Sequence, residues 1–183
     1  GHPLFATGLV QLLADRGDVA MAGGRWTLTR PLAEMDLEAP ESVRGLIREK
    51  IESLGDEDRR LLQYASVEGE EFLSTALASL LGVDELTMEE RCDDLHRVHR
   101  LIEPRGEEEV PDGAMAMRYR FVHALYQNEL YAGLGHKRRA QLHRKAGEQL
   151  LKHYGDQSSR IAAQLAMHFE RSRDFERAIA AVH

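Results

Sequence analysis

The chain has 183 residues, of which 43% are hydrophobic and 30% charged, a globular balance that argues against disorder and suffices for one large or two to three small domains. Its formal net charge of -7 disfavours a dedicated nucleic-acid binder, because neutralising phosphates requires a clustered basic face. The single cysteine, Cys92, excludes an intrachain disulfide, and no apolar run approaches the roughly 18 residues of a membrane span. With no visible signal peptide, we expect a cytoplasmic protein.

The N-terminal segment predicts a helix followed by a small β-hairpin. Pro3 suits the first turn of a helix over residues 3–16, because its missing N–H costs nothing at that position. Residues 19–21 and 25–29 flank a pair of glycines and are expected to form the two strands of the hairpin. Residues 31–40 are a polar connector, typical of a domain boundary.

From residue 41 the pattern predicts helices and then a two-stranded ribbon. The helices are expected over residues 41–54, from 56 onwards, over 72–81 and over 84–99. Asp84 is expected to cap the last of them. The expected core positions of that helix are Leu86, Met88, Cys92, Leu95 and Val98. A strand begins at residues 101–102, a polar loop follows over 103–113, and residues 115–122 return as a second strand. This order of elements is that of a winged helix.

The rest of the chain predicts helices only. They are expected at about residues 123–134, at 137–154, around 161–169 and from 175 onwards. The turn over residues 171–174 looks like the beginning of a tetratricopeptide-type helical hairpin. The pattern stops midway at His183, so both ends are expected to be cuts within a longer protein.

Four segments, taken in order, resemble motifs of the signal-transduction ATPases with numerous domains, the STAND class of P-loop ATPases. Residues 1–5 (GHPLF) resemble the glycine-any-proline motif that opens the helical lid domain of that class. Residues 40–47 (PESVRGLI) and 59–69 (RRLLQYASVEG) resemble the entry and next helix of its winged-helix domain, and residues 121–125 (FVHAL) resemble the closing motif. The last helices resemble the superhelical sensor arm. The combination is common in maltose-activator-like transcription factors and in ATPases fused to cyclase or kinase domains.

The resemblance implies a mainly α-helical chain of three parts. Residues 1–39 would be a lid-type helix with a small hairpin, 40–123 a winged-helix domain with a β-hairpin wing, and 124–183 the start of a tetratricopeptide-like arm. In the family, the proline of the first motif packs on the adenine, and the histidine of the closing motif touches the β-phosphate of ADP and locks the closed state. These roles fall on Pro3 and His123 here.

Both residues also have ordinary alternatives. The plant-resistance version of the closing motif reads methionine-histidine-aspartate, whereas Ala124 follows His123 in this chain, so the aspartate is missing. From the residues alone, His123 caps its helix or bonds to its own backbone, and Pro3 is a common helix-start proline.

The function that the resemblance implies is regulatory. The chain would couple the ADP or ATP state of an upstream nucleotide-binding domain to a sensor arm that contacts a protein partner, in transcriptional or signalling control. Neither a Walker A loop nor a Walker B site is present, so the chain alone is expected to be neither an enzyme nor a holder of a cofactor. The full-length parent would be an ATPase that uses ADP and ATP with Mg²⁺. The alternatives are a stand-alone winged-helix DNA-binding transcription factor with a helical dimerisation tail, and a plain helical adaptor.

Charge and ligand patterns refine these hypotheses. The expected recognition helix is acidic in its first half, and Glu107-Glu108-Glu109 follows in the wing, so we do not expect this segment to bind DNA. Cys92, His96 and His99 share a helix face, but zinc sites draw on at least two segments, so no metal is expected. A basic patch over residues 137–145 is either a solvated face or a contact for an acidic partner.

Overall fold

The computed structural model describes residues 13–14, 17, 19–22, 25–29, 41–110, 113 and 115–182. The chain is mainly helical with small antiparallel sheets, as the sequence predicted. Its contacts divide it into two compact units, Gly1–Ser53 and Leu54–His183. The three domain ranges expected from the sequence, 1–39, 40–123 and 124–183, stay predictions.

The described part of the first unit contains a hairpin and a helix. Strands β1 (Val19–Ala22) and β2 (Arg25–Leu28) are antiparallel. The hydroxyl of Thr27 donates to the carbonyl of Ala20 across them, 3.1 Å away. This confirms the predicted hairpin. Helix α2 (Glu41–Glu52) follows. The predicted helix over residues 3–16 lies outside the described residues except for Leu13 and Ala14, which are helical.

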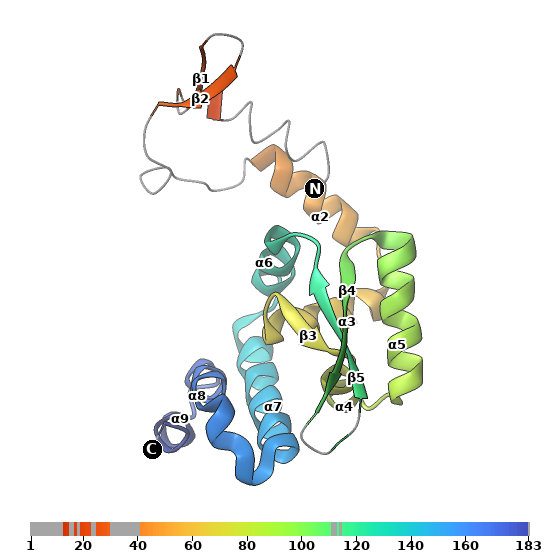
Figure 1. Cartoon of the computed structure of the whole chain (residues 1–183), viewed down its shortest axis with the longest axis vertical. Helices are drawn as coiled ribbons and strands as arrows, with labels where there is room; N and C mark the ends of the chain where they lie inside the picture. The colour runs from red at the N-terminus through yellow and green to blue at the C-terminus, as the bar shows by residue number, and fades with distance from the viewer. Residues whose placement is uncertain are drawn as a thin grey trace. The chain divides into compact units, whose positions relative to one another are not determined.

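The second unit begins with helices and a three-stranded sheet. In chain order these are α3 (Asp56–Glu68), β3 (Glu71–Leu73), α4 (Ser74–Leu81), α5 (Glu85–Asp94), β4 (Ile102–Glu109) and β5 (Met115–Phe121). The strands are antiparallel in the order β3-β5-β4, so the strand that is last in the chain lies in the middle of the sheet (Figure 1).

Two features of this sheet differ from the sequence prediction. Strand β3 falls where a helix was expected to begin, and the polar loop expected over 103–113 is largely strand β4. The glutamates of β4 are tolerated in a strand because arginines of β5 stand beside them: Glu103 lies 2.6 Å from the guanidinium of Arg120. Pro104 is accommodated because β4 is an edge strand, and the pairing shifts register between Pro104 and Gly106.

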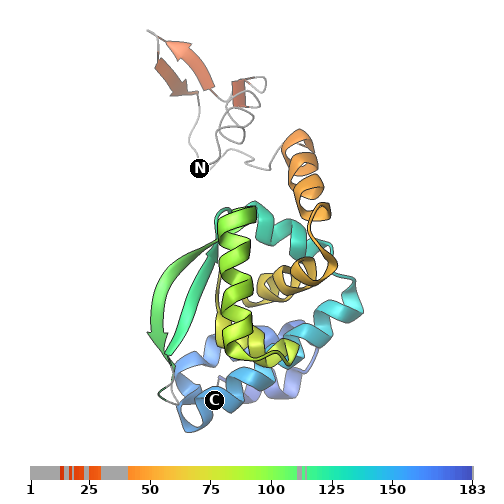
Figure 2. The same cartoon turned by 90° about the vertical axis from the view of Figure 1, so that its right-hand side faces the viewer.

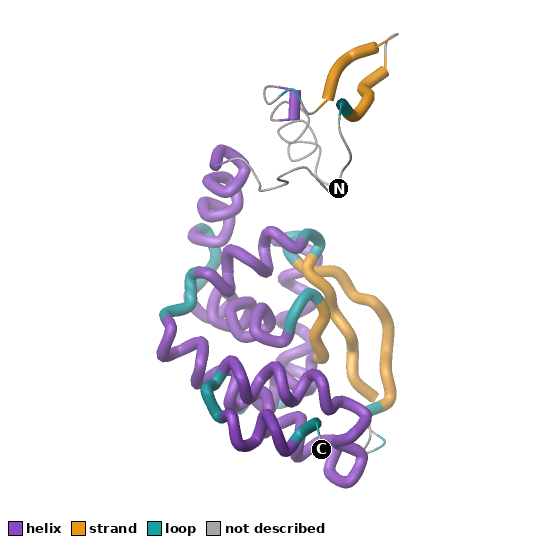
Figure 3. Tube along the Cα trace, turned by 90° about the vertical axis from the view of Figure 1, so that its left-hand side faces the viewer, coloured by secondary structure: helices purple, strands orange, loops and turns teal. Residues whose placement is uncertain are grey.

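The helices cover one face of the sheet, as Figures 2 and 3 show from opposite sides. Phe72 of β3 packs against Tyr119 and Phe121 of β5, with ring centroids 6.1 and 5.6 Å apart, and all three rings are buried. Burial of these aromatic side chains is the main apolar contribution of the sheet to the core. The opposite face of the sheet carries charged side chains instead, including Arg118, whose Nε donates to Glu108 over 2.7 Å.

Helix α5 presents its core face as predicted, with two exceptions. Met88, Cys92 and Leu95 are buried, whereas Leu86 and Val98 are exposed, at 69% and 65%. Leu86 precedes Met88 by two residues and therefore points to the opposite side of the helix. Val98 lies in a π-helical turn, Leu95–His99, whose wider winding shifts the positions that follow Leu95 out of phase with the core.

The remainder of the unit is helical. It consists of α6 (Ala124–Ala132), α7 (His136–Tyr154), a 3₁₀ segment (Gly155–Ile161), α8 (Ala162–Arg171) and α9 (Phe175–Ala180). Helices α6 and α7 pack on α3, and α8 packs on both α7 and α9. Helices α7 and α8 pack tightly at Gly147, where an added Cβ would lie only 3.0 Å from the ring of Phe169.

Candidate functional site

His123 lies at the corner between β5 and α6 and caps that helix. Its backbone is extended (φ -152°, ψ 136°), and its Nδ1 accepts the N–H of Leu125 at 3.1 Å. An atom that accepts a backbone N–H carries no proton, so this contact requires a neutral ring with its proton on Nε2. The capping role that the sequence left open for His123 is therefore present, and the nucleotide role stays a prediction.

The corner that carries His123 is held on both sides. The N–H of Val122 donates to the carbonyl of Leu101 at 3.0 Å, which ties it to the chain leading into β4. On the other side, the amide of Gln127 donates to the carbonyl of Ser66 at 2.8 Å and ties α6 to α3. Because neighbouring elements fix the backbone on either side of His123, the position from which its exposed imidazole projects is fixed as well. Pro3, the other residue assigned to nucleotide, lies outside the described residues.

A series of side-chain hydrogen bonds, buried at its inner end, connects α6, α7 and α8. His143 of α7 and His168 of α8 are 1% and 0% exposed, and their Nδ1 atoms lie 3.0 Å apart. The hydroxyl of Tyr131 lies 2.9 Å from Nε2 of His143 and accepts Nη1 of Arg171 at 2.8 Å.

Arg171 can only donate to the hydroxyl of Tyr131, so the proton of that hydroxyl is available for Nε2 of His143. When Tyr131 donates to this Nε2, the proton of the neutral His143 ring lies on Nδ1. Nδ1 of His143 then donates to Nδ1 of His168, whose remaining proton resides on Nε2. That Nε2 is buried without a hydrogen-bond partner in the described part of the chain. A buried donor without a hydrogen-bond partner destabilises a fold, so Nε2 of His168 lowers the stability of the folded state.

Both imidazoles are held neutral. Burial lowers the pKa of His143, and the neighbouring His168, Arg171 and Arg139 lower it further. Burial also lowers the pKa of His168, with a smaller effect of Arg171. Sequence reasoning did not single out either residue. Their spacing offered a signal, because His143 shares a helical face with Ala146 and Gly147, and His168 shares one with Leu165.

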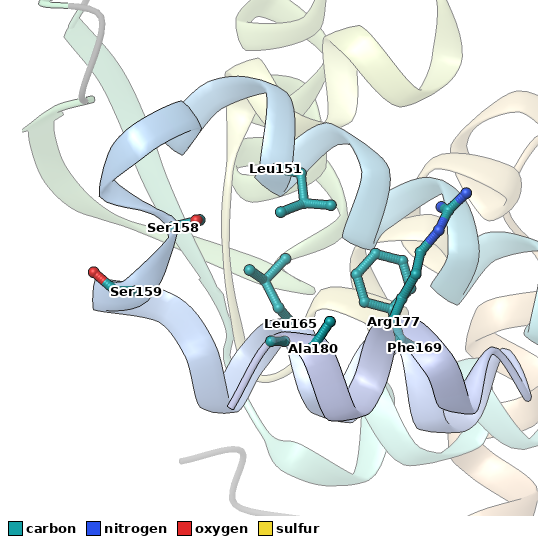
Figure 4. A pocket seen from close by; sticks show the side chains of 8 residues that line it. Leu151, Ser158, Ser159, Leu165, Phe169, Arg177 and Ala180 are labelled. Atoms are coloured by element: carbon teal, nitrogen blue, oxygen red, sulfur yellow. The ribbon is translucent and has the colours of Figure 1, made fainter. Parts of the chain in front are cut away.

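A mainly apolar pocket of about 300 Å³ lies where α7, α8 and α9 meet. Leu151, Leu165 and Phe169 point into it, Ser158 and Ser159 stand at one end, and Arg177 stands at the other (Figure 4). The adjoining helix α9 exposes Phe175 and Ile179, at 60% and 58%. The sequence predicted a helix from residue 175 onwards, and α9 (Phe175–Ala180) begins there with these two side chains on its surface.

The charged residues around α5 and the sheet are largely paired with one another. Arg91 pairs with Glu57, Arg97 with Asp94, and Arg118 with Glu108. Asp93 accepts the hydroxyl of the buried Tyr119 at 2.8 Å. Burial, and to a smaller extent this hydrogen bond, raises the pKa of that phenol. The charges of these three guanidinium groups are thus neutralised within this unit.

The three residues weighed as metal ligands do not form a site. Cys92 is buried, which raises its pKa to about 12, and Nδ1 of His96 lies 3.0 Å from the carbonyl of Ile102. No group of three or more His, Cys, Asp or Glu side chains among the described residues is arranged to hold a metal ion. Within the same ranges, no helix combines the length and the apolar character needed to cross a membrane.

Comparisons with protein-family models, curated proteins and solved structures found no match to this chain.

Proposed function

We propose that this chain is the regulatory, non-catalytic part of a STAND-class signal-transduction ATPase. In this proposal, α3 to β5 form the body of a winged-helix domain and α6 to α9 begin a tetratricopeptide-like arm. The observation that carries the proposal is the order helix, strand, helix, helix, strand, strand, combined with the sheet order β3-β5-β4. This topology supports the winged-helix reading more strongly than the sequence pattern, which lacked β3.

The geometry of His123 supports its proposed role toward a nucleotide. The cap to Leu125 occupies Nδ1, so the proton on Nε2 is oriented away from the backbone of α6. A neutral imidazole N–H is a suitable donor to a phosphate oxygen of ADP held by a neighbouring domain. The nucleotide and its Mg²⁺ would be held by that domain. His123 and Pro3 are the two residues of this chain that we propose to contact the nucleotide.

The charge pattern favours an interdomain module over a DNA reader. Helix α5 occupies the recognition position of a winged helix, and its exposed residues include Glu85, Glu90, Asp93 and Asp94. The arginines nearest to them are engaged in ion pairs. Phosphate contacts at this helix would require breaking those pairs and approaching several carboxylates. The stand-alone transcription factor is therefore the second candidate, and duplex binding is its test.

The first test is the mass of the native polypeptide that carries this sequence. A mass well above that of these 183 residues supports a regulatory block in a larger protein. A mass equal to it contradicts the proposal. Fluorescence anisotropy with duplex DNA at low salt provides the parallel test. Tight, salt-sensitive binding by this chain alone would favour the transcription factor.

The second test is ADP retention in that intact protein, with two variants of His123. Asparagine retains a helix-capping oxygen but lacks the imidazole, whereas alanine lacks both. If the ring touches the phosphate, both variants release ADP about tenfold faster and raise basal activity. If His123 is only a cap, His123→Asn retains ADP like the unsubstituted protein. That result would overturn the assignment of His123.

A further inference from the structure

A second pocket, of about 430 Å³, lies where α6, α7 and α8 meet. Besides Ala140, its lining consists of one aromatic and five basic side chains, namely Tyr131, His136, Lys137, Arg139, Arg171 and Arg173. They come from the end of α6, the first turns of α7, the end of α8 and the turn after it. The tertiary structure thus gathers four permanent cations from segments more than 30 residues apart onto one concave surface.

In the part of the chain that the structure describes, these cations have no carboxylate partner. Within the described ranges, Lys137, Arg139, Arg171 and Arg173 form no ion pair, and no carboxylate lines the pocket. By contrast, Arg59 of α3, Arg91 of α5 and Arg118 of β5 are each paired with an acidic residue. In a chain with a net charge of -7, four uncompensated cations in one pocket produce a local positive potential that attracts an anion.

The start of α7 adds to this potential. Its N-cap, Gly135, offers no side chain to the first-turn N–H groups, and that turn contains no acidic residue. His136 and Lys137 occupy it instead. Basic side chains at a helix N-terminus are opposed by the helix dipole. A bound anion would accept from the N–H groups and neutralise the side chains at the same time.

Two of the arginines are held in place before any ligand arrives. Arg139 lies over the ring of Tyr131, 4.3 Å from its centroid, and donates to the carbonyls of Tyr131 and Leu134 at 3.0 and 3.1 Å. Arg171 donates to the hydroxyl of the same tyrosine. Part of the side-chain entropy that binding usually removes is therefore already lost. Nε of Arg139 is buried without a partner in the described structure.

We propose that this pocket binds the phosphate group of a small ligand. Phosphate is favoured over a carboxylate because its double charge and tetrahedral oxygens match several cationic donors that converge from different helices. The volume exceeds that of a single phosphate, so it has room for a group attached to the phosphate. The inference does not depend on the proposed regulatory function, because it uses only α6, α7 and α8.

The test is a titration of the 183-residue chain with anions, in which two-dimensional NMR records the backbone amide signals at each anion concentration. Inorganic phosphate, pyrophosphate and ADP are the probes, with acetate at equal ionic strength as the control anion. We expect saturable shifts at residues 135–139 and 171–173 with the phosphate probes and much weaker shifts with acetate. Tighter binding of ADP than of pyrophosphate would assign the extra volume to a nucleoside, and the reverse would assign it to a second phosphate. Absence of saturable shifts with all three phosphate probes would overturn the proposal.

Matched variants distinguish a specific phosphate site from nonspecific electrostatic attraction of anions. Lys137→Gln and Lys152→Gln remove the same charge from opposite ends of α7, about 22 Å apart. Only Lys137 lines the pocket. We expect Lys137→Gln to weaken phosphate binding about tenfold, the usual effect of losing one charged hydrogen bond, and Lys152→Gln to leave it nearly unchanged. Equal effects of the two variants would contradict the proposal.

Arg173→Gly is a second variant that spares the fold. Arg173 has a left-handed backbone (φ 63°), which glycine adopts without strain. This substitution should therefore maintain or raise thermal stability while weakening phosphate binding about tenfold. A variant that is fully stable and binds phosphate unchanged would exclude Arg173 from the site. If Lys137→Gln also had no effect, the pocket itself would be excluded.

Discussion

His143 and His168 face each other inside the helical half of the second unit, with their Nδ1 atoms 3.0 Å apart and almost no solvent exposure. The ring that accepts this hydrogen bond must be neutral, and two imidazolium groups at this distance would repel each other. The pair joins α7 to α8 and ends the series of side-chain hydrogen bonds that begins at Arg171. It therefore couples the packing of these helices to pH.

The first prediction concerns the stability of the chain at acidic pH. Both imidazoles have a pKa below the usual 6.5 in the folded state, so the unfolded chain binds more protons below that pH. Stability is therefore fully present above about pH 6.5 and falls as the pH is lowered toward 5, by about 2 kcal/mol for each imidazole. Urea unfolding at pH 7.5 and pH 5 measures this loss.

The double variant His143→Gln with His168→Gln is the comparison, because glutamine retains hydrogen-bonding groups without titrating. We expect its stability to change less than that of the unsubstituted chain between these two pH values. An equal loss in both proteins would assign the acid sensitivity to other groups.

The second prediction concerns Glu68, at the end of α3. Burial raises the pKa of its carboxyl to about 7, so the folded state binds more protons than the unfolded state between about pH 4.5 and 7. Stability therefore falls as the pH rises through this window, opposite in sign to the histidine pair. Because Glu68 retains some solvent contact, we expect an effect of about 2 kcal/mol rather than the full value for its shift.

Glu68→Gln should remove the loss of stability caused by the buried carboxylate, so it should stabilise the chain at pH 8 and change its stability little at pH 4.5. Glu70→Gln, two residues away and exposed, is the matched control and should have little effect at either pH. Thermal unfolding at the two pH values is sufficient. A Glu68→Gln variant that is no more stable at pH 8 than the unsubstituted chain would show that the carboxyl is not destabilised by burial.

The third prediction concerns the contact between α7 and α8. Gly147→Ala places a Cβ 3.0 Å from the buried ring of Phe169, which has little room to move. We expect a loss of about 1–2 kcal/mol, because overpacking outweighs the gain in helix propensity. Gly45→Ala, in α2 with no atom near the added Cβ, should instead stabilise by up to about 1 kcal/mol. Chemical denaturation of both variants measures the sign of each effect, and stabilisation by Gly147→Ala would contradict the packing described.

The fourth prediction separates the cap at His123 from any ligand role. In the isolated chain, His123→Ala removes the acceptor for the N–H of Leu125 and should destabilise by about 1 kcal/mol. His123→Asn should be close to neutral, because asparagine is a favoured capping residue. Thermal unfolding of the two variants side by side is the measurement. Equal stabilities for both would mean that the bond to Leu125 contributes nothing to the start of α6.

The local elements of this chain follow from its sequence. The hairpin near residue 25, the cap of α5 by Asp84 and the burial of Met88 and Cys92 were all predicted. These features depend on residues within a few positions of one another, where spacing, capping chemistry and turn residues act directly. The helix-capping role of His123 could be predicted for the same reason, because the bond joins His123 to Leu125, two residues away.

Only the tertiary structure decided which distant segments meet. The sequence of β4 is polar and predicts a loop, and only its pairing with β5 places arginines beside its glutamates. The three residues of β3 are too few to show a periodic pattern. The contact between His143 and His168 joins residues 25 positions apart, and the basic pocket joins α6, α7 and α8. The sequence by itself determined the helices, the hairpin and the capping residues, because those depend on near neighbours. It did not determine charge pairing or burial between helices, because these depend on the packing of the whole unit.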